Sequence, residues 1–89
     1  MDFEWDDDKD EINMRKHGVT FAEAATVLGD PLAITFFDPD HSYGESRSLT
    51  IGSSIDGRVL ILSHTDRGEN IRIISARRAD ARERRNHGR

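Results

Sequence analysis

Six polar side chains in the second half of the chain are of the types that metal-independent RNA cleavage requires. That reaction needs a base for the 2′-hydroxyl, an acid for the departing 5′-oxygen and cations beside the pentacovalent phosphorane. A carboxylate, an imidazole and several guanidinium groups suit these tasks. The candidate catalytic residues are Glu45, Arg47, His64, Arg67, Arg72 and Arg77.

Each of these side chains also has a purely structural interpretation. Glu45 and Arg47 are two residues apart, so on a strand they share a face and can pair with each other. His64 can be a hydrogen-bonded residue near the end of a strand. Arg67 falls in a predicted turn, where an arginine is usually solvated.

The spacing of Arg72 and Arg77 raises a separate question. They are five residues apart, and a regular strand sends residues at odd spacing to opposite faces. One of them can then pair with the acidic N-terminal helix while the other faces a site. A bulge or a strand end before Arg77 would bring both to the same face.

The net charge of −4 hides a strong asymmetry along the chain. Residues 1–11 carry seven acids and one lysine, whereas residues 67–89 carry eight arginines and three acids. The overall acidity argues against a general nucleic-acid coat protein, but the basic segment permits local contact with a polyanion. Arginine outnumbers lysine eleven to two, and its planar fork suits phosphate, although a GC-rich genome produces the same bias.

Length and composition predict a single domain over residues 1–89. There are no cysteines, and the four histidines lack short metal-ligand spacing, so we expect no metal and no cofactor. The acidic N-terminus does not resemble a secretory signal, and no segment approaches the length of a membrane span. We therefore expect a cytoplasmic protein that does not contact membranes.

Two helices are predicted at the start of the chain. Asp6 or Asp7 can cap a helix over residues 7–17, with acids in its first turn, bases in its last turn and Gly18 after it. Thr20 and Glu23 form a capping box that begins a second helix, which ends before Gly29. A helix-turn-helix DNA reader is disfavoured, because the acidic first helix would repel phosphates.

After residue 31 the pattern changes to that of strands. We expect strands over residues 32–37, 46–55, 59–62 and 71–76, then a short helix over 79–86. Asp56-Gly57 and the 66–69 segment indicate hairpin turns. The prediction is an α+β fold, with the two N-terminal helices packed on one face of a four-stranded antiparallel meander sheet. The other face would be partly open, framed by the last strand and the C-terminal helix.

Three stretches of the chain resemble a known family over about residues 3–87. They read FEWDDDKDEINMRKHGVTFAEAATVLGDP, then ESRSLTIG, then GRVLILSHTDRGENIRIISARRADARERR. The most specific pieces are W-D-x-x-K with N-x-x-K-H-G-V-x-F, and R-I-I-S-A-R with E-R. This order of motifs is similar to the BrnT family of type II toxins.

The resemblance implies a RelE-like ribonuclease toxin that cleaves RNA without a metal and inhibits translation. It also implies neutralisation by a BrnA-type ribbon-helix-helix antitoxin, through which alone the complex would contact DNA. Family positions add Lys16 and His17 of the K-H-G motif to the arginines named above. The alternative is a non-catalytic protein-binding module that acts as a co-repressor within a toxin–antitoxin DNA-binding complex.

The C-terminal end departs from the family pattern. Members often carry a Tyr soon after the E-R pair, where this chain has His87. A histidine can stack on a base and donate a hydrogen bond, or it can be a frayed tail residue. The Arg78–Arg85 run is explained most simply as helix surface available to a partner or to RNA. The candidate RNA-binding residues are therefore Lys16, His17, Arg78 and His87.

Overall fold

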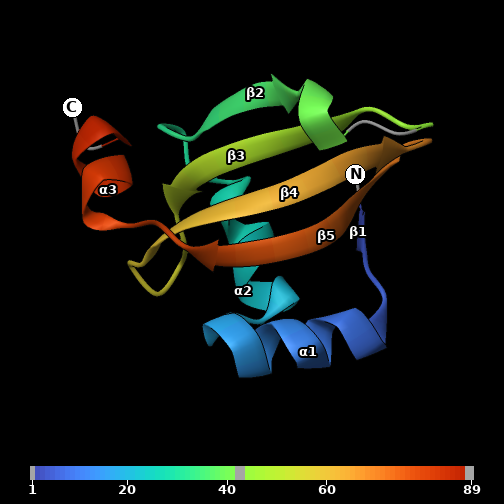
Figure 1. Cartoon of the computed structure of the whole chain (residues 1–89), viewed down its shortest axis with the longest axis horizontal. Helices are drawn as coiled ribbons and strands as arrows, with labels where there is room; N and C mark the ends of the chain where they lie inside the picture. Colours follow the sequence, from blue (N-terminus) through green and yellow to red (C-terminus); the bar gives the residue numbers. More distant parts are fainter. Residues whose placement is uncertain (1, 42–43, 88–89) are drawn as a thin grey trace.

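The computed structural model describes residues 2–41 and 44–87 of the chain. Figure 1 shows a single sheet with helices at one face and at one end. None of the helices in the described ranges has the length and apolar content needed to cross a membrane. In chain order the elements are β1 (Phe3–Glu4), α1 (Asp7–His17), α2 (Phe21–Val27), β2 (Ile34–Asp38), the 3₁₀ turn η1 (Pro39–His41), β3 (Arg47–Ser53), β4 (Val59–Arg67), β5 (Asn70–Arg78) and α3 (Ala81–His87).

The sheet has five strands in the order β1-β5-β4-β3-β2. The meander β2-β3-β4-β5 is antiparallel throughout, as predicted. The prediction of a four-stranded, purely antiparallel sheet was wrong, because Phe3–Glu4 adds a fifth strand parallel to β5. A two-residue strand has no periodicity of its own, so its partner defines it.

Both N-terminal helices begin and end where their capping residues predict. The Asp6 carboxylate accepts hydrogen bonds from the N–H groups of Asp8 and Lys9 at 2.9 and 3.1 Å, which starts α1. Gly18 ends that helix with φ of 68°, a left-handed conformation that favours glycine. The Thr20 hydroxyl accepts from the Glu23 N–H at 3.1 Å and starts α2.

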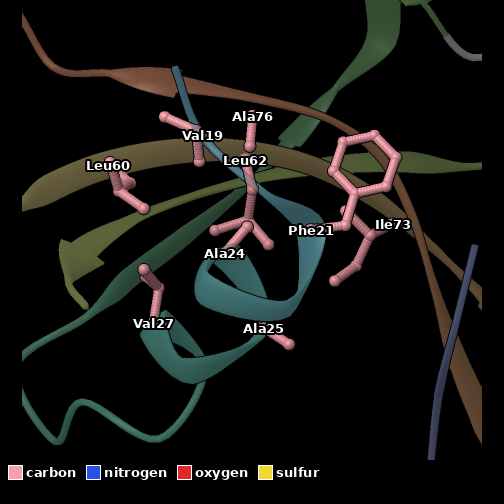
Figure 2. Packing of buried hydrophobic residues seen from close by; sticks show 9 residues of the cluster. All are labelled: Val19, Phe21, Ala24, Ala25, Val27, Leu60, Leu62, Ile73 and Ala76. Atoms are coloured by element: carbon pink, nitrogen blue, oxygen red, sulfur yellow. The ribbon is translucent and has the colours of Figure 1, made fainter. Parts of the chain in front are cut away.

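The hydrophobic core lies between α2 and one face of the sheet. Figure 2 shows Phe21, Ala24 and Val27 of the α2 segment pointing towards Leu60, Leu62 and Ile73 of the central strands. Trp5 extends the core, with its ring centroid 6.3 Å from that of Phe21 in an edge-to-face contact. None of the helices in the described part of the chain covers the other face of the sheet in Figure 1, and we call it the open face.

A buried asparagine fixes α1 against the edge of β5. The Asn13 amide donates to the carbonyls of Ala76 and Val19 at 2.8 and 2.9 Å, and its oxygen accepts from the Ala76 N–H at 3.1 Å. The side chain thus satisfies the same backbone groups that a neighbouring strand would. This contact holds the C-terminal end of α1 beside β5.

An ion pair fixes α2 against the β3–β4 hairpin. Arg58 donates to both carboxylate oxygens of Glu23, one of these bonds being 2.9 Å, and the Ser54 hydroxyl donates to the same carboxylate at 2.8 Å. The pKa of Glu23 is lowered, chiefly by the hydrogen bond from Arg58. Both contacts favour the charged carboxylate and keep α2 in place under the sheet.

Candidate functional site

A bulge in β5 brings Arg72 and Arg77 to the same face. Ser63 pairs with Ser75 but His64 pairs with Ile73, so Ile74 is an extra residue in β5. Arg77 lies opposite Ile61 and Arg72 opposite Thr65, two positions of equal parity on β4. Both arginines therefore lie on the open face, as the hypothesis of an irregular strand required.

The open face carries a row of polar residues across all five strands. Asp38 lies opposite Arg47, which lies opposite Thr65, which in turn lies opposite Arg72. Glu4 of β1 completes the row beside Arg72. The row has a carboxylate at each end, and inside these it has two arginines with the uncharged Thr65 between them.

Three hollows meet at Ser75 of β5, and we call them together the Ser75 groove. The first, about 120 Å³, reaches from His17 and Arg77 to Leu49. The others extend towards α1 and towards β2 and β3. The polar residues that line the groove are Lys9, Asn13, Lys16, His17, Asp38, Arg47, Ser63, Ser75 and Arg77.

Arg77 is held in place by a carboxylate of α3. Its two terminal nitrogens each donate to one oxygen of Glu83 at 2.9 Å. Glu83 also accepts the N–H of Asp80 at 2.8 Å, while Asp80 accepts the N–H of Glu83 at 2.8 Å, which caps α3. The Arg77 hydrogen bond is the main reason why the pKa of Glu83 falls to about 2.

Two other predicted cations also have carboxylate partners. Arg72 donates to Glu4 of β1 at 3.0 Å, with both side chains half-buried. Arg67 donates to Glu45 at 3.3 Å, so the structure does bring these two predicted residues together. Neither pair lines the Ser75 groove. A phosphate that approaches either arginine meets an ion pair and not a lone cation.

His64 lies on the other side of the sheet. It pairs with Ile73 in the helix-covered layer, is 7 % exposed, and its Nε2 lies 2.7 Å from the Thr50 hydroxyl. Burial lowers the pKa of His64, although the nearby Asp66 opposes this effect. The imidazole is therefore a neutral core group, and the structure does not bring it together with Arg72 or Arg77.

The remaining predicted RNA-binding residues are divided among three places. Lys16 and His17 end α1 and line the groove. Arg78 lies opposite Leu60, so the strand directs it away from the open face. His87 lies in a separate hollow. Its side chain is 6 % exposed, and its Nε2 lies 3.8 Å from the Asp30 carboxylate. This placement differs from that of a frayed tail residue.

Sequence reasoning did not select Ser63 and Ser75. They form the floor of the groove, and their hydroxyls can donate hydrogen bonds to a phosphate. The available signal was a small polar residue at the centre of each of two strands. Among the described residues, no three His, Asp or Glu side chains are grouped so that they could bind a metal ion.

Two comparisons with known proteins point to the same family. The profile of a family described as "Ribonuclease toxin, BrnT, of type II toxin-antitoxin system" matches residues 5–83. The crystal structure of the Brucella abortus ribonuclease toxin BrnT is similar in fold, with a TM-score of 0.70 and 26 % sequence identity over 90 % of this chain and 97 % of that one. The curated proteins contain no match. This chain therefore belongs to the BrnT family of ribonuclease toxins of type II toxin–antitoxin systems.

Proposed function

We propose that the chain cleaves RNA at the Ser75 groove, by attack of a 2′-hydroxyl on the adjacent phosphate and without a metal. The observation that carries this proposal is that His17 and Arg77 line the same hollow over a floor of Ser63 and Ser75. The groove lies on an open face, where a single RNA strand has access. The proposal includes the RelE-like mode of action that the sequence resemblance implies.

Each group in the groove has a task in that reaction. Arg77 neutralises the phosphorane, and its N–H groups that are not bonded to Glu83 can donate to phosphate oxygens. His17 transfers a proton, either from the 2′-hydroxyl or to the departing 5′-oxygen, which is the usual task of an imidazole near neutral pH. Lys16 and Arg47 hold the neighbouring phosphates, since both line the connected hollows. The products are a 2′,3′-cyclic phosphate and a 5′-hydroxyl.

Glu45 is the second candidate for proton transfer. It lies just before β3 with its carboxylate 3.3 Å from Arg67. That pair would place a base and a cation side by side, although neither residue lines the groove. Comparison of His17→Ala with Glu45→Gln decides which residue carries the proton.

The test is cleavage of a labelled RNA by the purified chain in EDTA. We expect His17→Ala and Arg77→Ala each to lower the cleavage rate by about a hundredfold or more. Arg15→Ala is the matched control, because Arg15 belongs to the same helix as His17 and its side chain is 73 % exposed. Thermal unfolding must show that all variants are folded. Full activity in both groove variants would disprove the site.

The partner proposed for the chain is a protein antitoxin of the BrnA type, with DNA contacted only through that antitoxin. Family membership implies an antitoxin but does not specify its fold. In cells, expression of the chain should arrest growth, and the antitoxin gene should rescue it. If the wild-type chain binds its antitoxin but never cleaves RNA or arrests growth, it is a non-catalytic co-repressor.

A further inference from the structure

The two edges of the sheet differ in how they are covered. Along β5, the backbone is paired with β1 at Ile71 and Arg72, and the Asn13 side chain takes the groups of Ala76. β2 is the last strand at the opposite edge, and in the described ranges no strand lies beyond it. An uncovered edge offers N–H and C=O groups to any strand that approaches.

The side chains of this edge are unusually apolar. Leu32, Ile34, Phe36 and Phe37 are 74, 53, 49 and 56 % exposed, four large apolar residues within six positions. Exposed edges are commonly protected by lysine, proline or an inward charge, and Ile34–Asp38 contains none of these before Asp38 at its end. Such a concentration differs from scattered single apolar residues and indicates a surface that is covered in use.

We propose that this edge is covered by a second copy of the same chain, with the two β2 strands paired antiparallel about a two-fold axis. If the axis passes at Thr35, Ile34 of each copy lies opposite Phe36 of the other. Both residues lie on the open face, next to Ile51 and Leu49 of β3. The dimer then has one continuous sheet with an apolar stripe across the join.

The charges at the two ends of β2 favour the antiparallel direction. Asp38 and Asp40 lie at its C-terminal end. At its N-terminal end, Arg84 and His87 of α3 share a hollow with Ile34, which Asp30 also lines. Three arginines and one glutamate give α3 a net positive charge. An antiparallel copy brings the acidic end beside the partner's α3, whereas a parallel copy would bring like charges together.

Sedimentation equilibrium of the purified full chain measures this association. We expect a dimer for the wild type, and at least a tenfold weaker association for Phe36→Glu, which places a carboxylate against the partner's Ile34. Ile55→Glu is the matched control, since Ile55 is an apolar residue at the β3–β4 hairpin that is 81 % exposed. Its association should equal that of the wild type.

A cross-link tests the register independently of any destabilised variant. The chain contains no cysteine, so Thr35→Cys introduces a single thiol at the proposed axis. Under mild oxidation we expect a covalent dimer with Thr35→Cys and none with Ile55→Cys at the same concentration. Equal cross-linking of both variants would overturn the register.

Three other results would overturn the proposal. The first is a wild-type chain that is monomeric at every concentration. The second is a dimer that Phe36→Glu leaves intact. The third is a monomer whose antitoxin binding is lost with Phe36→Glu, because the edge then belongs to a different protein. None of these measurements depends on RNA cleavage, so they stand or fall apart from the proposed ribonuclease site.

Discussion

Replacement of Glu83 by Gln removes the charge that holds Arg77 and caps α3. The carboxylate accepts two hydrogen bonds of 2.9 Å from Arg77 and one of 2.8 Å from the Asp80 N–H. Together these lower its pKa from an ordinary 4.5 to about 2. We expect Glu83→Gln to destabilise the fold in a pH-dependent way.

The magnitude follows from the lowered pKa. A pKa change of this size corresponds to about 3 kcal/mol at neutral pH as an upper bound. The side chains of Arg77 and Glu83 are 46 and 28 % exposed, so solvent screens the pair. Since glutamine also keeps part of the hydrogen bonding, about 1–1.5 kcal/mol is a reasonable expectation.

The sign of the pH dependence is defined by the same numbers. Because the pKa of Glu83 is lower in the folded chain, its contribution to the free energy of unfolding is complete above pH 4.5 and is lost as the pH falls towards 2. At pH 3 the contribution should be roughly two fifths of its full value. Urea unfolding of wild type and variant at pH 7 and pH 3 measures this, with Glu69→Gln as an exposed control. An equal loss at both pH values would refute the reasoning.

Three further predictions concern the framework. Asn13→Ala removes three buried hydrogen bonds and should cost about 3 kcal/mol in urea unfolding, whereas Met14→Ala, at a 48 % exposed position, should change little. His64→Gln should keep RNA cleavage and flatten the stability profile below about pH 6.5, the ordinary pKa of a histidine. Because the pKa of His64 is lower in the folded chain, the free energy of unfolding of the wild type decreases as the pH falls through the ordinary histidine pKa of 6.5. An unchanged profile in the variant would contradict this. Gly52→Ala would place a methyl group 3.0 Å from the Val27 Cγ1, and we expect a loss of about 2 kcal/mol, seen as a lower Tm.

The helices and the meander could be predicted because their signals are local. Asp6, Thr20 and Gly18 act through hydrogen bonds and backbone angles within a few residues of themselves. The Asp56-Gly57 turn acts in the same way, with φ of 81° at Gly57. The apolar run at residues 59–62 correctly indicated a central strand, since β4 is third of five.

Features that depend on distant partners could not be predicted. Phe3–Glu4 becomes a strand through its pairing with β5, which lies almost seventy residues later in the chain. The bulge at Ile74 appears in the sequence as nothing more than an odd interval between two arginines. The length of β4 was underestimated, because polar residues at its end continue the pairing as far as Arg67.

The composition of the candidate site was predicted better than its layout. The chemistry of phosphate binding selected Arg47 and Arg77 from the sequence, the resemblance to the family added His17, and the histidine selected for its chemistry was His64. His64 faces away from the groove because of the strand register, whereas His17 lines the groove because the Asn13 contact holds α1 beside β5. Neither of these is encoded in local sequence. The carboxylate partners of the arginines likewise come from distant segments or from α3.

The pairing of Arg72, Arg77 and Arg67 with Glu4, Glu83 and Glu45 has a thermodynamic consequence. A nucleic acid that binds a protein releases condensed cations, and this release makes affinity fall steeply with added salt. If one of these arginines turned towards a phosphate, it would leave its carboxylate behind, and that carboxylate would attract a cation from solution as the RNA gave one up. In the free protein the carboxylates thus serve as the counter-ions of the arginines. Its affinity for RNA should accordingly vary with ionic strength much less than the number of arginines suggests.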